Sequence, residues 1–428
     1  MRRAIVLLLL ATGCASVPRD EGLGDLRQAI SARTGQTLND PRAAALLQSE
    51  LTADNAVALA MANSPRLQAT LAELGIARAE LLQASLLRNP LFEAEVRFPR
   101  DPFRPFELRL AQTLVDLIQL PRRRALGRLA FDAAKLRITS EVVSFAADVR
   151  SRHAELLAAS QRVTLSRVNL EAARAAAELA QRQHDAQNIT DLELENEQAH
   201  YEEAKLDLAR EERQLVVARE ALVRMMGTTA EWQLPAEFPP LPESEQDPRQ
   251  LEQLALARRL DLELARNQVT LTRQQVPMAR LAALGEVTVD VHYQRDAAGA
   301  KTVGPGIELP IPIFNTGAAA RSRAEAEYLR ATHLLNALLA ESASQLRTTS
   351  AVLAEARARV EYYRDVVVPR RQRIVELTKL EHNAMLVGPF QLLQAKQNEA
   401  QARRDFIDAQ RDYWTARVGL DRAINGGQ

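Results

Sequence analysis

A stretch of about 65 residues in the first half of the chain most constrains its fold, because nothing in it would end a helix. It runs from Pro121 to Gln187 without a further proline or a cluster of glycines, and apolar residues such as Val142, Phe145 and Val149 recur at spacings of three and four. At about 1.5 Å per residue, one helix over residues 121–187 would be on the order of 100 Å long. The same reasoning predicts long helices over residues 191–226, 318–383 and 390–424.

The composition suits a protein built from such helices. The 55 Lys and Arg residues balance 55 Asp and Glu residues, so no overall basic field would attract nucleic acid or an anionic membrane surface. Aromatic residues make up only 4% of the chain, fewer than two or three ordinary globular domains would carry. The predicted helices are polar over much of their circumference. This suits either a solvated coiled-coil stalk or a hollow wall of helices, and periodicity does not separate the two.

The chain contains two weakly similar halves. Residues 183–186 (Gln-His-Asp-Ala) and residues 381–384 (Glu-His-Asn-Ala) lie 198 positions apart, and a proline-rich run over residues 235–248 lies between the halves. Each half has the same order of a short helix, two alternating segments and two long helices. We therefore expect an N-terminal segment, a first repeat, a linker and a second repeat over residues 14–50, 51–227, 228–248 and 249–426.

Apolar and polar residues alternate in two segments of each half, over residues 91–98 and 106–114 and over residues 286–295 and 303–313. A period of two is typical of a strand with one apolar and one polar face. Charges on the polar face and the length of the segments suit tilted transmembrane strands around a water-filled lumen. Two soluble hairpins packed on a core are the alternative.

Four strands per chain are too few to close a membrane barrel, since the smallest have about eight. Two copies of the chain would supply eight strands and a filled interior, and three copies would supply twelve and a channel. The number of strands therefore does not decide between two and three copies of the chain. Pro305, Pro310 and Pro312 weaken the later part of the last predicted strand.

The N-terminus predicts secretion. A basic head over residues 1–3 precedes an apolar run over residues 4–11, as in a signal peptide that would end at residue 13. Cys14 is the only cysteine, and its surroundings resemble a bacterial lipobox. This resemblance implies cleavage before Cys14, a covalent lipid on its thiol, and sorting to the outer membrane because Ala15 follows it. An ordinary signal peptide with an incidental cysteine is the alternative.

Several motifs, taken in their order along both halves, resemble the TolC-like outer-membrane efflux protein family. The most specific is Ile307 to Gly317, with the sequence IELPIPIFNTG, which is similar to the family's strand-to-helix junction. Residues 62–65 (Ala-Asn-Ser-Pro) and residues 89–91 (Asn-Pro-Leu) resemble the opening of its first repeat. The resemblance covers the chain from about Leu51 to Gly426.

This resemblance implies a mainly α-helical fold with a small β part. Long helical hairpins would form a periplasmic α-barrel, and four transmembrane strands per chain would close as a twelve-stranded barrel in a homotrimer. The implied function is the passive exit duct of a tripartite efflux system in the cell outer membrane. The implied partners are a periplasmic adaptor (membrane fusion) protein and an inner-membrane transporter of the RND type. The alternative is a non-conducting, lipid-anchored periplasmic coiled-coil scaffold or adaptor protein.

The resemblance also implies roles for the two turns between the long helices. Leu386, Val387 and Gly388 resemble the tip that the family presents to its adaptor. Gly388 is expected to take a backbone conformation that most residues resist, and Pro389 to start the next helix. Asp191 matches an aspartate that helps to hold the family's aperture closed, although a simple charge at a helix N-terminus explains it equally well.

The sequence predicts no catalytic residues, no cofactor and no metal site, and therefore no enzyme. Its six histidines form no His-x₃-His pair and no cluster with the cysteine, so the spacing of a zinc site is absent. His184 and His382 occupy equivalent positions in the two halves, which favours a structural role on the helix surface. The lipid on Cys14 is the only non-protein group that we expect. No motif specifies the transported substrate.

Overall fold

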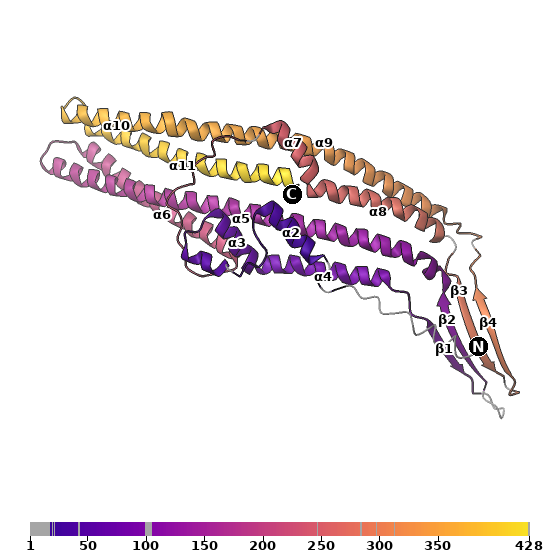
Figure 1. The fold of residues 1–428 in the computed structure, drawn as a ribbon. Helices are drawn as coiled ribbons and strands as arrows, with labels where there is room; N and C mark the ends of the chain where they lie inside the picture. The colour runs from indigo at the N-terminus through magenta and orange to yellow at the C-terminus, as the bar shows by residue number, and fades with distance from the viewer. Residues whose placement is uncertain are drawn as a thin grey trace. The chain divides into compact units, whose positions relative to one another are not determined.

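The structure, a computed structural model, describes residues 18, 20, 22–41, 43–98, 105–245, 247–282, 285–296, 298–311 and 313–426. The predicted signal peptide over residues 1–13 and the predicted lipidation site Cys14 lie outside these residues. Within them the chain is mainly α-helical with one small sheet, as the sequence predicted (Figure 1).

The two halves follow the same order of elements, except that a π turn divides the first long helix of the second half. The first half contains α3 (Ala53–Asn63), α4 (Pro65–Ser85), β1 (Leu91–Val96), β2 (Phe106–Thr113), α5 (Leu114–Asp185) and α6 (Asp191–Met226). The second half contains α7 (Pro248–Arg258), α8 (Leu260–Ala282), β3 (Thr288–Arg295), β4 (Lys301–Glu308), α9 (Ala318–Tyr362), a π turn η2 (Tyr363–Val367), α10 (Val368–Asn383) and α11 (Pro389–Asn425). Before them, the described residues include α2 (Leu23–Thr34) and a 3₁₀ helix η1 (Ala43–Gln48).

The chain divides into two compact units, and the first comprises Met1–Leu26, Leu71–Ile138 and Leu260–Ala340. Among its described residues are the whole sheet and the adjoining parts of α4, α5, α8 and α9. Leu74 and Leu81 of α4 and Phe131 of α5 are buried in it. A Cβ at Gly127 of α5 would lie 2.8 Å from the Cβ of Ala84, so α4 and α5 can approach closely only because this residue is glycine.

The two predicted pairs of strands join into one four-stranded sheet. Its order is β1-β2-β3-β4, and every neighbouring pair is antiparallel. The pairing of β2 with β3 joins the two halves of the chain, from Phe106 opposite Arg295 to Thr113 opposite Thr288. Both repeats therefore contribute to one sheet, with β1 and β4 at its edges.

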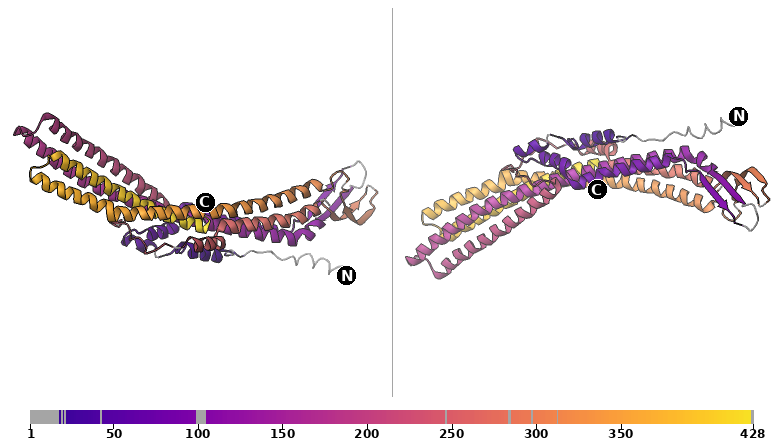
Figure 2. Two further views of the ribbon diagram at one scale, coloured as in Figure 1. Left: turned by 90° about the horizontal axis from the view of Figure 1, so that it is seen from above. Right: turned by 90° about the horizontal axis from the view of Figure 1, so that it is seen from below.

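The second unit comprises Arg27–Thr70, Thr139–Arg259 and Glu341–Gln428. It contains two helical hairpins, α5 with α6 and α10 with α11, which lie side by side and end in turns (Figures 1 and 2). Tyr413 of α11 is fully buried against Leu251 of α7 and Leu353 of α9. Its hydroxyl donates a hydrogen bond of 2.6 Å to Glu245, which precedes α7. Trp232 is buried in the segment between α6 and α7.

Three boundaries differ from those predicted. The last strand, expected over residues 303–313, ends at Glu308, because Pro310 cannot donate to the strand ladder. The first long helix begins at Leu114 and continues through Pro121 instead of starting there. The helix expected over residues 318–383 is interrupted by η2, which ends two residues before Pro369. A proline ring presses on the carbonyl four residues earlier and offers no N–H to it, and the wider π turn relieves that conflict.

In the described ranges, none of the helices has a stretch long and apolar enough to cross a membrane.

Candidate functional site

The two helical hairpins of the second unit end in turns of the same backbone shape. In the α5–α6 turn, Gln187 has a φ of 60°, and its N–H donates to the carbonyl of His184 at 2.8 Å. In the α10–α11 turn, Met385 has a φ of 58°, and its N–H donates to the carbonyl of His382 at 2.9 Å. In both turns the next N–H bonds to the carbonyl just before the histidine, so both helices end in the same left-handed cap.

Gly388 does not take the unusual conformation predicted for it. Its φ of −75° and ψ of 169° are extended backbone, which any residue adopts. The left-handed residue of this turn is Met385, whose position in the helix cap demands it. Gly388 is instead the N-cap of α11, which begins at Pro389 as predicted. A Cβ at position 388 would lie 3.2 Å from Oε1 of Gln391.

The α10–α11 turn presents apolar side chains to solvent. Met385 is 93% exposed and Leu386 is 75% exposed. Val387 is half-buried, and its carbonyl accepts a hydrogen bond of 3.1 Å from Nδ1 of His382. The turn therefore brings Leu386, Val387 and Gly388 together at one exposed tip, and His382 holds its shape.

Asp191 lies in the other turn, at the first position of α6. Its side chain is 96% exposed, and its Oδ1 accepts a hydrogen bond of 2.7 Å from Nε2 of His184 at the end of α5. A carboxylate at this position also stabilises the helix dipole. Within one chain, Asp191 therefore joins the two ends of its own turn.

Thr190 and Glu193 cap α6 reciprocally. Oγ1 of Thr190 accepts from the N–H of Glu193 at 3.3 Å, and Oε2 of Glu193 accepts from the N–H of Thr190 at 2.9 Å. These bonds lower the pKa of Glu193, because they favour its ionised form. The cap fixes the residue at which α6 begins and hence the position of Asp191.

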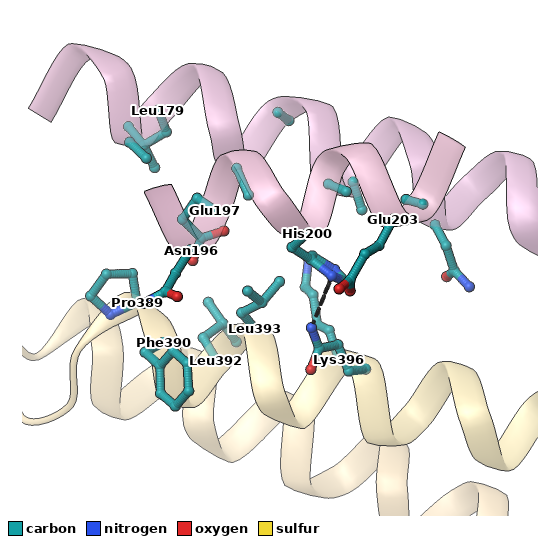
Figure 3. Close-up of a pocket in the computed structure, with 18 of the residues that line it drawn as sticks. Leu179, Asn196, Glu197, His200, Glu203, Pro389, Phe390, Leu392, Leu393 and Lys396 are labelled. Atoms are coloured by element: carbon teal, nitrogen blue, oxygen red, sulfur yellow. Dashed lines mark hydrogen bonds between the residues drawn. The ribbon is translucent and has the colours of Figure 1, made fainter. Parts of the chain in front are cut away.

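A groove of about 960 Å³ lies beside the turns, with α5 and α6 on one side and α11 on the other (Figure 3). Its apolar lining includes Leu179, Leu392 and Leu393. Two polar contacts join α6 to α11 along it. Nε2 of Gln397 donates to Nδ1 of His200 at 3.1 Å, and Nη1 of Arg404 lies 3.3 Å from Oδ2 of Asp207.

Glu197 lines the same groove with an unsatisfied carboxylate. Its Oε2 is buried and has no hydrogen-bond partner among the described residues. Burial raises the pKa of Glu197 because desolvation disfavours the charged form, and the nearby His200 opposes this by a smaller amount. The groove therefore holds an acid that is more easily protonated than an ordinary glutamate.

In the first unit, one arginine contacts acids on all the other strands of the sheet. Nη2 of Arg109 on β2 lies 3.1 Å from Oδ1 of Asp290 on β3 and 3.1 Å from Oε2 of Glu308 on β4, and its Nη1 lies 3.6 Å from Glu93 on β1. Only 7% of the Asp290 side chain is exposed, and Nδ1 of His292 lies 3.6 Å from its Oδ2. One guanidinium group therefore serves three carboxylates on the polar face.

The other face of the sheet is apolar and exposed. The register places Phe92, Leu110 and Val291 in one row across β1, β2 and β3, and Val289 opposite Ile307. All five side chains are exposed in the single chain. An apolar surface of this kind marks contact with another protein or with lipid.

The sequence predicted the alternation in the strands but not which polar residues meet. The spacing between the two repeats could have predicted some of these pairs, because several residues that contact each other lie almost one repeat apart in the sequence. Arg88 and Glu286 lie 198 positions apart and pair at 2.6 Å, and His200 and Gln397 lie 197 apart. In the part of the chain that the structure describes, no three His, Cys, Asp or Glu side chains gather to hold a metal ion.

Comparisons with known proteins extend these observations. Residues 251–426 match the family described as Outer membrane efflux protein. The comparison with curated proteins gave no match. The chain resembles the structure of CusC, a protein that forms a transmembrane channel, with a TM-score of 0.73 and 15% identity over 88% of this chain and 93% of that chain.

Two further solved structures show the same fold. The outer membrane protein VceC from Vibrio cholerae has a TM-score of 0.70 and 16% identity, over 88% of this chain and 96% of that chain. The CmeC outer membrane channel from Campylobacter jejuni has a TM-score of 0.70 and 16% identity, over 88% of this chain and 86% of that chain.

The fold is thus that of outer-membrane efflux channels, and the second half of the chain carries the family's domain. The match over residues 251–426 agrees with the resemblance of the motifs to the TolC-like outer-membrane efflux protein family. This family and fold are those of channels and not of known enzymes.

Proposed function

We propose that three copies of this chain form a passive exit duct in the outer membrane for a tripartite efflux system. The observation that carries the proposal is the sheet, in which an exposed apolar face lies opposite a charged face. Among the described residues of one chain, its edge strands β1 and β4 each pair with a single neighbour. Closing three such sheets into one twelve-stranded barrel would satisfy both edges, turn the apolar face to lipid and turn the charged face to water. The family domain over residues 251–426 supports the same function.

The rival function, a non-conducting scaffold, is not favoured. A scaffold would need another protein layer over the apolar face of the sheet, because such a surface is costly to leave in water. The family and the fold are those of channels.

The exposed tip of the α10–α11 turn is our proposed contact for a periplasmic adaptor. Leu386, Val387 and Gly388 offer an apolar surface that is easily reached, and an inner-membrane transporter of the RND type would supply the energy. Asp191 is our proposed residue at the periplasmic gate. In a trimer three copies of this exposed carboxylate would approach one another, so that release from His184 could accompany opening.

We also propose that Cys14 carries a covalent lipid, which would anchor the chain to the outer membrane from the periplasmic side. The support is the position of the only cysteine, directly after the predicted signal peptide. The lipid would serve as an anchor in addition to the strands, so the duct itself should not depend on it.

The test is the native mass of the detergent-extracted protein, followed by conductance in planar bilayers. Three copies of the 47.5 kDa chain should give about 140 kDa before processing and lipid, and this species should form pores. The variant Cys14→Ser should lose metabolically incorporated palmitate and still form trimeric pores. A monomer that leaves the membrane without detergent once Cys14 is replaced would overturn the duct and leave the scaffold.

A further inference from the structure

The polar face of the sheet carries a strong excess of negative charge. Its acids are Glu93, Glu95, Glu107, Asp290 and Glu308, and its bases are Arg109 and, just after β1, Arg97. With His292 neutral, the face has a net charge of −3 per chain.

The contacts on this face show that the excess is not neutralised locally. Arg109 serves Glu93, Asp290 and Glu308, so one positive charge faces three negative charges. Towards the hairpin end, Arg97 pairs with Glu95 at 2.8 Å, and Glu107 lies opposite Glu95 in the register.

Much of this charge is open to solvent. The side chains of Glu93 and Glu308 are 51% and 68% exposed, so their fields reach any ion that passes along the face. Asp290 is covered, and it holds Arg109 in place between the outer acids. On β4, Gly304 lies opposite His292 and Gly306 lies opposite Asp290. Because glycine has no side chain, β4 adds no bulk to the polar face at these two positions.

From this arrangement we infer that the duct prefers cationic cargo, and that the polar face of its sheet sets this preference. The inference rests on the proposed function, because charges on this face select cargo only if the face lines a passage. A closed trimer would carry three copies of the excess in one ring. Walls of low dielectric constant focus such a field and concentrate counter-ions, here cations, along the path.

The test measures the reversal potential of the reconstituted pore in a tenfold KCl gradient. We expect the permeability of K⁺ to exceed that of Cl⁻ several-fold at about 0.1 M salt, where the Debye length is about 10 Å, and the ratio to approach one at about 1 M, where it is about 3 Å. Tetraethylammonium chloride in place of KCl should give the same sign, because an organic cation meets the same field.

Charge variants test whether the polar face of the sheet sets the preference for cations. The double variant Glu93→Gln/Glu308→Gln changes the net charge of the face from −3 to −1 per chain and should lower the permeability ratio towards one. Arg97→Gln should raise the ratio above that of the unmodified chain. Glu231→Gln removes the same charge from an exposed loop of the second unit and should leave the ratio unchanged. Trimer mass and single-channel conductance show whether each variant is intact.

The outcomes separate this inference from the function on which it rests. Absence of pores would overturn both. Pores with a ratio at or below one would overturn the cation preference and leave the duct. A ratio above one that the double variant does not lower would show that other charges set it, and would overturn the role of the sheet.

Discussion

Gln187 and Met385, 198 residues apart in the sequence, take the same left-handed backbone conformation, with φ values of 60° and 58°. Each donates its N–H to the carbonyl of a histidine, His184 or His382, that occupies the equivalent position in its own half. The two tips thus share one cap although their side chains differ. The backbone geometry of the helix end determines this shape, and the left-handed position strains a residue with a Cβ.

Replacing either residue by glycine should therefore stabilise its tip. We expect Gln187→Gly and Met385→Gly each to slow amide exchange in the turn by the equivalent of about 0.5–1 kcal/mol, because glycine adopts this conformation without strain. Hydrogen exchange resolved by mass spectrometry over residues 182–193 and 380–391 would measure it. Gln187→Ala keeps the Cβ and should give no such gain. Equal exchange in the alanine and glycine variants would contradict the explanation.

The capping box of α6 predicts an acid-sensitive helix start. Hydrogen bonds from Thr190 lower the pKa of Glu193 in the folded state, so this contact stabilises the fold above the unfolded pKa and loses its effect as the pH falls through the folded pKa. An NMR titration of the Glu193 carboxyl should show a midpoint below that of an ordinary glutamate. Thr190→Ala removes the hydroxyl but keeps the backbone N–H, which is the larger cause, so it should raise the midpoint only part of the way towards the ordinary range. An unchanged midpoint in that variant would show that the hydroxyl of Thr190 contributes nothing to the shift, and a midpoint at the ordinary value would contradict the role of the backbone N–H.

The buried carboxylate of Glu197 should make the folding stability depend on pH with the opposite sign to that of Glu193. Burial raises its pKa in the folded state, so its ionised form disfavours the fold at neutral pH. This penalty shrinks as the pH falls through the folded pKa and is gone below the unfolded pKa. Glu197→Gln should raise the thermal stability at pH 7 by up to about 1 kcal/mol, because the amide does not carry the negative charge whose desolvation is costly. The gain should vanish at low pH.

The matched control for Glu197 is Glu203→Gln. Glu203 lines the same groove but is exposed. Its replacement should change thermal stability little at either pH. A gain from Glu203→Gln as large as that from Glu197→Gln would indicate a general effect of charge in the groove and not of burial at one carboxylate.

Gly306 should tolerate no side chain. A Cβ there would lie 2.6 Å from Oδ2 of Asp290, and Arg109 holds that short side chain in place. Gly306→Ala should therefore cost about 1–3 kcal/mol, measured as the denaturant midpoint of the trimer in detergent. Gly304→Ala is the control, because its Cβ would meet the edge of the His292 ring at 3.3 Å, and it should cost less. Equal losses would show that glycine matters here only for the backbone.

Much of the fold follows from the sequence because periodicity is a local property. The four strands were predicted within a few residues except at Pro310, and α6 begins at Asp191 and ends at Met226 as predicted. The interruption before Pro369 was not predicted, although a proline inside a helical pattern always removes one hydrogen bond. The tip residues 386–388 were located from their motif, but the strained residue of that turn proved to be Met385.

The sequence by itself determined the repeat, the long helices and the two faces of each strand, because hydrophobic spacing and turn residues act over a few positions. Only the tertiary structure decided that Arg109 lies among acids on three other strands and that Gln397 bonds to His200 across the groove. These contacts join residues from distant parts of the chain. Their existence depends on the register of β2 with β3 and on the packing of α6 beside α11, which no local pattern encodes.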